Sequence, residues 1–122
     1  MRKRTSESPS TNPILLVQEP ANRRGTASGT TRFSGRFADR LSPEFFRVGP
    51  DGLAVSSLGI GTYLGECDRA EDDRYTSAVT ASIRVGINLL DTAINYRCQR
   101  SERSVGAAIE AATSAKLNDS LR

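Results

Sequence analysis

Apolar and polar positions along the chain follow two different patterns, which meet near residue 45. Up to residue 44 the apolar residues have no sustained period, and serine, threonine, glycine and proline separate them. From residue 45 onward, short apolar runs alternate with stretches whose apolar residues recur every three or four positions. We therefore expect a disordered, basic, Ser- and Thr-rich tail over residues 1–44 and a folded segment over residues 45–122.

Residues 45–63 predict short strands joined by a tight turn. The sequence FFRVG, at 45–49, is a short apolar run, and Pro50, Asp51 and Gly52 follow it as turn-forming residues. The sequence LAVSSLGIGTY, at 53–63, is a second extended run. We expect it to complete a hairpin and then to form the first strand of a larger sheet.

A helix is expected over residues 72–86. Tyr75, Val79 and Ile83 recur at four-residue steps, and Gly86 stands where a C-terminal cap would be. Negative charge near the helix start favours its N-terminus, and four acidic residues supply it there: Asp68, Glu71, Asp72 and Asp73.

A second pair of strand and helix follows. The sequence INLLDTA, at 87–93, is a compact apolar run, and a helix is expected from about Ser101. Strands that alternate with helices of this length imply parallel pairing through right-handed crossovers, which is typical of the α/β class. The expected apolar face of the second helix has four members: Val105, Ile109, Ala112 and the stem of Lys116.

The formal charge of +3 is unevenly spread along the chain. Residues 1–40 hold eight basic and three acidic residues, whereas residues 41–122 hold nine basic and eleven acidic residues. The basic character therefore belongs to the tail, and the folded segment offers no obvious surface for nucleic acid. The longest apolar run has only a few residues, so no membrane-spanning segment is expected.

The tail has two interpretations. Its Arg-rich, Ser-rich and acid-poor composition is typical of organellar transit peptides, but it has three acidic residues and no clear amphipathic helix, which favours a dispensable extension. The apolar run ILLVQ, at 14–18, could form a strand against another surface. We expect a cytoplasmic location, or an organellar one if the tail is a transit peptide.

The two cysteines, Cys67 and Cys98, predict neither a disulfide framework nor a metal site. So few cysteines are more typical of a reducing compartment than of a disulfide-stabilised fold. The chain has no histidine, and the cysteines lack the spacing of zinc ligands. No metal is expected.

Glycines at the end of the first strand suggest a close approach of the backbone to a ligand or to another segment. Gly59, Gly61 and Gly65 resemble the dinucleotide-binding fingerprint, but their spacing is one residue too long. Asp91, the acidic residue that would complete that fingerprint, comes later than the pattern requires. A Rossmann fold is therefore the weaker interpretation of these glycines.

Asp91 and Tyr96 lie at the end of the second strand, where α/β folds build their sites. A carboxylate that ends a buried apolar run needs a partner, because an unpaired buried charge is costly. Taken alone, Asp91 could simply cap the following loop, and Tyr96 could be a packing residue. The motifs in the rest of the sequence favour a functional role for both residues.

The folded segment resembles the aldo-keto reductase family over about residues 46–115, in the order, spacing and type of its residues. The long spacing between Ala93 and Glu102 is similar to the branch that contains many bacterial oxidoreductases and potassium-channel beta subunits. The chain differs where Tyr63 replaces a frequent tryptophan and Arg97 replaces a usual glycine. The hairpin and the first strand match at Arg47, Gly52, Leu53, Val55, Ser56, Leu58, Gly59, Gly61 and Thr62. The signature segment and the second helix match at Gly86, Asp91, Thr92, Ala93, Tyr96, Ser101, Glu102, Val105 and Gly106.

The resemblance implies NADPH-dependent reduction of aldehydes or ketones. It implies that Tyr96 is the catalytic proton donor and that Asp91 is the catalytic carboxylate that holds a lysine beside it. A neighbouring positive charge is needed because a tyrosine with a pKa of about 10 is otherwise a poor acid near neutral pH. The implied NADP(H)-binding residues are Gly61, Thr62, Tyr63 and Asp91.

The resemblance also implies an incomplete (β/α)8 TIM barrel, with a hairpin followed by two strand–helix units. Such a barrel typically has ~250 residues, and the lysine and histidine that the family uses have no counterpart here. The only lysines are Lys3 and Lys116. We therefore expect a fragment of a reductase that is inactive by itself. The alternative is a noncatalytic binding or regulatory module of the same fold, which could self-associate through exposed strand edges.

Overall fold

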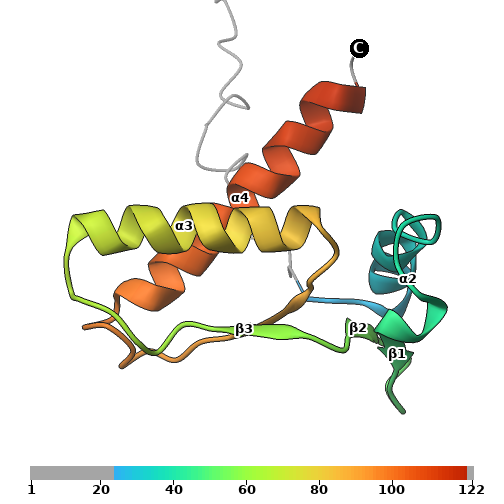
Figure 1. Ribbon diagram of the computed structural model, residues 1–122, viewed down its shortest axis with the longest axis horizontal. Helices are drawn as coiled ribbons and strands as arrows, with labels where there is room; N and C mark the ends of the chain where they lie inside the picture. The colour runs from blue at the N-terminus through green and yellow to red at the C-terminus, as the bar shows by residue number, and fades with distance from the viewer. Residues whose placement is uncertain (1–23, 121–122) are drawn as a thin grey trace, which may run out of the picture.

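The computed structural model describes residues 24–120, and side chains up to residue 114. In this part of the chain, no helix has both the length and the apolar character that crossing a membrane requires. The described elements in chain order are helix α2 (Ala27–Gly35), the short 3-10 helix η2 (Pro43–Phe45), strands β1 (Phe46–Val48), β2 (Ala54–Ser56) and β3 (Gly59–Gly61), helix α3 (Arg69–Arg84), strand β4 (Leu89–Asp91) and helix α4 (Arg100–Ser120) (Figure 1).

Strands β1 and β2 form an antiparallel hairpin around the predicted turn. Val48 pairs with Ala54, and the Asp51 carboxylate accepts a hydrogen bond of 3.1 Å from the Leu53 backbone N–H. Gly52 has a φ of 81°, in the left-handed region that glycine adopts without steric cost. The turn chemistry of the sequence is therefore sufficient to place this hairpin.

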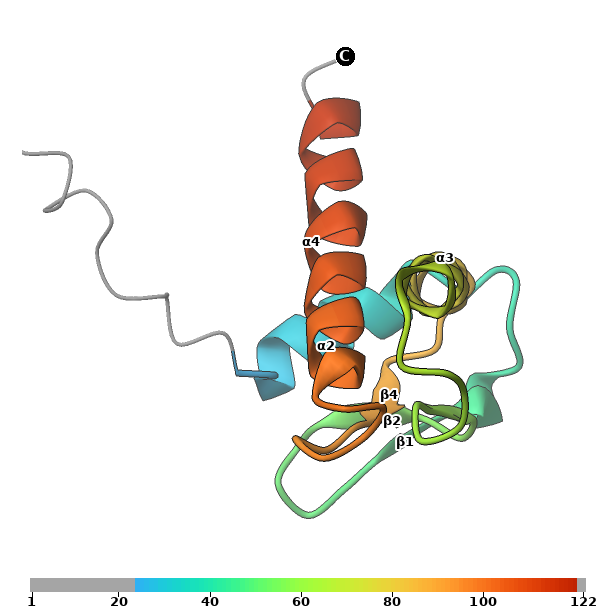
Figure 2. The ribbon, with the colours of Figure 1, turned by 90° about the vertical axis from the view of Figure 1, so that its left-hand side faces the viewer.

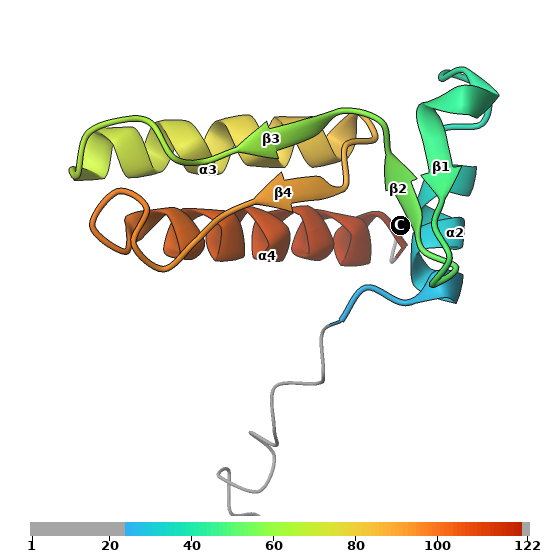
Figure 3. The same ribbon diagram turned by 90° about the horizontal axis from the view of Figure 1, so that it is seen from below.

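Strands β3 and β4 form a separate parallel pair, connected through α3. Gly59 pairs with Leu89, and Gly61 pairs with Asp91. Helices α3 and α4 both lie on one face of this pair, and the opposite face is uncovered in the described chain (Figure 3). Helix α4 runs obliquely across α3 (Figure 1), and Figure 2 shows α3 almost end-on beside α4.

The core lies where α3 and α4 pack together over the β3–β4 pair. Val79 of α3 and Ala108 of α4 are fully buried, and Val105 and Ile87 are almost fully buried. These side chains are small or medium in size, so the two helices can approach closely. Val79 and Val105, which the periodicity assigned to apolar helix faces, are buried as predicted, whereas Ile109 of the predicted face is 41% exposed and the fully buried Ala108 was not predicted.

The predicted barrel architecture is wrong for this structure. The described strands form two separate two-stranded sheets, ordered β1–β2 and β3–β4, and each strand has only three residues. Closing a barrel requires each strand to pair on both sides, whereas each described strand has a single partner. The fold is a small mixed α/β arrangement, with one antiparallel hairpin and one parallel pair covered by two helices.

The structure also differs from the predicted tail, because residues 24–44 are not disordered. Thr26 caps α2 by accepting a hydrogen bond from the Gly29 N–H, and the Thr30 hydroxyl accepts one of 3.0 Å from the Ala54 N–H of β2. Phe37 is buried beside Phe46 of β1, with ring centroids 6.4 Å apart. Residues 1–23, including the apolar run at 14–18, lie outside the described part.

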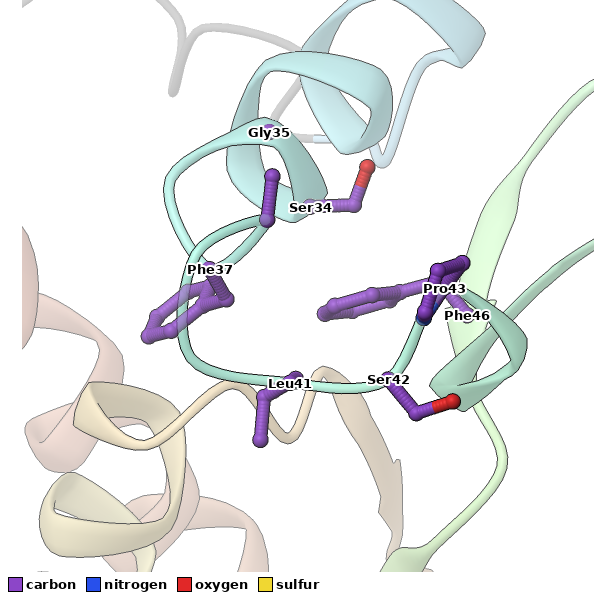
Figure 4. Close-up of a pocket in the computed structure, with 8 residues that line it drawn as sticks. Ser34, Gly35, Phe37, Leu41, Ser42, Pro43 and Phe46 are labelled. Carbon is purple, nitrogen blue, oxygen red and sulfur yellow. The ribbon is translucent and has the colours of Figure 1, made fainter.

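Phe37 and Phe46 border a pocket of about 200 Å³ between α2 and the hairpin (Figure 4). Ala38, Leu41 and Pro43 complete its apolar lining, and no charged side chain lines it. The segment that the sequence assigned to a tail therefore packs against the hairpin through aromatic contacts.

Helix α3 begins at Arg69, earlier than predicted, because Asp68 is its N-cap. The Asp68 carboxylate accepts a hydrogen bond of 2.8 Å from the Glu71 N–H. At the other end, Val85 is the C-cap and Gly86 has a φ of 110°. The predicted capping role of Gly86 is therefore confirmed.

Asp68→Ala is expected to lower the free energy of unfolding by about 1 kcal/mol, because the cap hydrogen bond is lost. Chemical denaturation followed by far-UV circular dichroism measures this change. Asp73→Ala is the matched control, because Asp73 is an exposed residue of the same helix without a side-chain hydrogen bond in the described structure. Equal losses for the two variants would contradict the capping role.

Candidate functional site

The parallel strands end side by side, and their ends are joined by Thr62. The Thr62 backbone N–H and hydroxyl both donate to the Asp91 carbonyl oxygen, at 3.1 and 2.8 Å. The Ser101 hydroxyl of α4 donates to the Thr62 carbonyl oxygen at 2.6 Å, and both side chains are fully buried. Because these three segments are locked together, the side chains that follow each strand have a fixed relative position.

Tyr63 and Tyr96 meet next to this junction. Their ring centroids are 5.0 Å apart and their planes are inclined by 76°, an edge-to-face contact. Tyr63 is 65% exposed, and Tyr96 is half-buried. The structure therefore brings together Thr62, Tyr63, Asp91 and Tyr96, which we call the strand-end cluster.

The Asp91 side chain is on the uncovered face of the β3–β4 pair. Asp91 is exposed, and its neighbour Leu89 on the same face is 47% exposed. None of the ion pairs among the described residues includes Asp91. The expectation that Asp91 ends a buried run is therefore wrong, because the helices cover only the other face of the pair.

Gly61 lies opposite Asp91 in the strand pairing, and the space above it is open. A Cβ atom added to Gly61 would meet no other atom within 4 Å. A Cβ atom added to Gly59 would instead meet Leu89 at 3.0 Å. Of the two strand glycines, only Gly61 leaves free space beside the strand-end cluster.

A second polar network, which sequence reasoning missed, supports the turn after Tyr96. The Arg97 side chain is fully buried, and its guanidinium pairs with the Asp72 carboxylate at 2.8 Å. Its Nε–H donates a hydrogen bond of 3.1 Å to the Glu66 carbonyl oxygen. The guanidinium carbon also lies 4.5 Å from the centroid of the Tyr75 ring, on which the group stacks. Arg100 contacts the other Asp72 oxygen at 2.5 Å.

The sequence contained a partial signal for this network. Arg97 stands where the resembling family usually has a glycine, and its φ of 48° is in the left-handed region that glycine favours. Asp72 was assigned only to the favourable charge at a helix start. Its second role depends on Arg97, which is 25 residues away in the sequence.

Cys67 and Cys98 form a disulfide, with Cα atoms 5.9 Å apart. This overturns the expectation that the two cysteines do not make a structural bridge. The bond joins the loop after β3 to the turn after β4, across 31 positions of sequence. These two segments also carry Tyr63 and Tyr96, so the bond spans the strand-end cluster.

Asp72 has a lowered pKa. Desolvation by itself would raise the pKa of this carboxyl, but hydrogen bonds and charge attraction from Arg97 and Arg100 outweigh it. The ionised carboxylate is therefore favoured more in the folded state than in the unfolded chain. Its contribution to stability is present above the unfolded pKa of about 3.9 and is lost as the pH falls through the folded pKa.

We expect the melting temperature to fall on acidification from about pH 5 to about pH 3, in part because Asp72 loses its charge. Thermal denaturation at several pH values measures this dependence. Asp72→Asn should make the dependence shallower, whereas Asp73→Asn, an exposed neighbour, should leave it unchanged. If Asp72→Asn kept the full pH dependence, the stabilising role of its charge would be refuted.

No family model matches the chain, and its comparison with solved structures gave no significant match. The resemblance to aldo-keto reductases therefore stays a prediction, carried by the motifs and by the positions of their residues. Among the described residues, no group of three or more His, Cys, Asp and Glu side chains could hold a metal ion.

Proposed function

We propose that the strand-end cluster is part of the site of an NADPH-dependent carbonyl reductase, of which this chain is a fragment. One observation carries the proposal: the parallel register places Asp91 opposite Gly61, and Thr62 locks the two strand ends together. This brings the residues matched to the cofactor and the residues matched to the chemistry to one edge of the sheet. The proposed substrate is a small aldehyde or ketone.

The described residues fit one part of a nicotinamide cofactor. Gly61 leaves open space beside Asp91, and the exposed Tyr63 ring offers a flat apolar surface next to it. NADPH, when bound, supplies the hydride to the carbonyl carbon. In this proposal, one side of the cofactor is held near the strand ends by Gly61, Thr62 and Tyr63.

In this proposal, Tyr96 gives a proton to the carbonyl oxygen, and Asp91 positions the cation that assists it. The Tyr96 ring is oriented by its edge-to-face contact with Tyr63. The Asp91 carboxylate is exposed on the uncovered face of the sheet, so it is accessible to a lysine from outside the described residues. Without such a lysine, the phenol remains a poor acid near neutral pH.

A hybrid enzyme tests the proposal. Residues 46–114 would replace the matching N-terminal segment of an aldo-keto reductase, which supplies the lysine and histidine. We expect the hybrid to oxidise NADPH in the presence of an aldehyde, measured by absorbance at the nicotinamide band, and the isolated chain to show no turnover above background. A folded hybrid that binds NADPH but reduces no carbonyl compound would contradict the proposed function.

A noncatalytic binding role is the second candidate, and the uncovered face of the β3–β4 pair favours it. Leu89 of β4 is 47% exposed, and Leu58, Leu64 and Ile94, which lie in the segments flanking the two strands, are exposed to between 57% and 74%. The free edges of β3 and β4 in the described chain are also open to pairing with another strand. Self-association measured by sedimentation velocity would support this role, and Leu89→Glu should then abolish it.

A further inference from the structure

We infer that the Cys67–Cys98 disulfide is a redox-sensitive clamp. It holds the turn after Tyr96, residues 97–99, against the loop that carries Tyr63, residues 62–68. The bond connects the only two loops that carry tyrosines of the strand-end cluster. Both cysteine residues are exposed, so a reductant in solution can reach them. This inference concerns the conformation of the turn and does not depend on the proposed reductase activity.

The turn that the disulfide holds is conformationally strained. Arg97, Cys98 and Gln99 have φ angles of 48°, 57° and 69°, so three consecutive residues with side chains are in the left-handed region. This conformation is unfavourable for residues other than glycine, and it persists only where the surroundings enforce it. Cys98 is the central residue of the three, which places the disulfide at the middle of the strained segment.

Two tethers connect the turn to the loop after β3, in addition to the ion pairs that Arg97 and Arg100 make with Asp72 of α3. The disulfide links Cys98 to Cys67, and the buried Arg97 side chain donates to the carbonyl oxygen of Glu66, the preceding residue. The Arg97 tether has one unsatisfied group, because its buried Nη1 has no hydrogen-bond partner. Opening the disulfide therefore leaves the strained turn held by the side chains of Arg97 and Arg100 alone, with one Arg97 donor unsatisfied.

Reduction would proceed by thiol–disulfide exchange with a dithiol. One thiolate of the dithiol attacks a cysteine sulfur and forms a mixed disulfide, and its second thiol then displaces that cysteine. The protein gains two electrons and two protons and ends with two free thiols, while the dithiol ends as a cyclic disulfide. The opened turn can then leave the left-handed region, and Tyr96 separates from Tyr63.

The effect should be local, because the helix packing does not involve the cysteines. Val79 of α3 and Ala108 of α4 are fully buried, and neither cysteine belongs to these helices. The hydrogen bonds from Thr62 to the Asp91 carbonyl oxygen also join the strand ends independently of the disulfide. We therefore expect the strands and helices to persist when the bond opens.

Amide hydrogen exchange of the full chain, measured by NMR with and without dithiothreitol, tests the clamp. The turn is reported by the Tyr96 and Arg100 amides, which donate to the Ala93 and Arg97 carbonyl oxygens. We expect their exchange to accelerate at least tenfold on reduction, while the interior amides of α3 near Val79 change by less than twofold. Reoxidation with glutathione disulfide should restore the original rates.

Two variants separate this clamp from other effects. Cys67→Ser/Cys98→Ser should show the fast turn exchange without reductant and should not respond to it. Gln99→Gly should reduce the acceleration on reduction, because glycine adopts the left-handed conformation without strain. Unchanged turn exchange on reduction would overturn the clamp, and so would an equal acceleration in α3, because the bond would then stabilise the whole fold.

Discussion

Tyr96→Phe in the hybrid enzyme is expected to lower kcat by about 10²–10⁴-fold, the typical contribution of general acid–base catalysis. The change removes only the phenol hydroxyl, and the ring can keep its contact with Tyr63. Cofactor affinity should therefore stay close to that of the parent hybrid. Steady-state kinetics with an aldehyde and fluorescence titration with NADPH would separate the two effects.

Asp91→Asn in the same hybrid should also lower kcat strongly if the proposal holds, because it removes the charge proposed to position the assisting lysine. The side chain is exposed on the uncovered face, so its replacement should change the melting temperature little. Asp73→Asn is the matched control, and it should leave kcat unchanged. The contradicting outcome for the first prediction is a Tyr96→Phe hybrid with the turnover of the parent hybrid. Tyr96 would then be a packing residue, and the catalytic interpretation would lose its basis.

Arg97→Ala is expected to lower the free energy of unfolding by about 3 kcal/mol, because several contacts of a fully buried guanidinium are lost together. The variant removes the pair with Asp72, the hydrogen bond to the Glu66 carbonyl oxygen and the stacking on Tyr75. Asp72 keeps Arg100 and is partly exposed, so the remaining carboxylate is not an isolated buried charge. Urea denaturation measures the loss.

Two control variants resolve the origin of this effect. Arg100→Ala should cost less than half as much, because that side chain is 35% exposed. Arg97→Gly should be more stable than Arg97→Ala by about 1 kcal/mol, since glycine removes the steric cost of the left-handed backbone. If Arg97→Ala were as stable as the wild-type chain, the buried network would have no net stabilising role.

Local sequence signals were sufficient for the individual elements of residues 45–114. Pro50, Asp51 and Gly52 determine the hairpin turn, and the periodic spacing of Val79 and Val105 places both in the helix interface. The sequence also placed Asp91 at the carboxyl end of a strand in a parallel pair, and the structure has Asp91 there, paired with Gly61 of β3. Each of these predictions depends on residues that are close in the sequence, or on the rule that strands joined through a helix pair in parallel.

The larger architecture did not follow from the same signals. The motif order predicted part of a closed barrel, whereas the structure has two separate two-stranded sheets with one uncovered face. That uncovered face also explains why Asp91 is exposed, although the run before it is apolar. Burial of a strand depends on what covers each of its faces, and the strand sequence does not contain this information.

The sequence by itself therefore determined the hairpin turn, the burial of Val79 and Val105 and the strand end at which Asp91 lies, because these depend on short-range spacing. Only the tertiary structure decided the contacts between distant segments. These are the packing of α2 on the hairpin, the pairing of Arg97 with Asp72 and the disulfide between Cys67 and Cys98. Such contacts depend on how the chain brings remote residues within a few ångströms of each other, and composition and periodicity do not specify that distance.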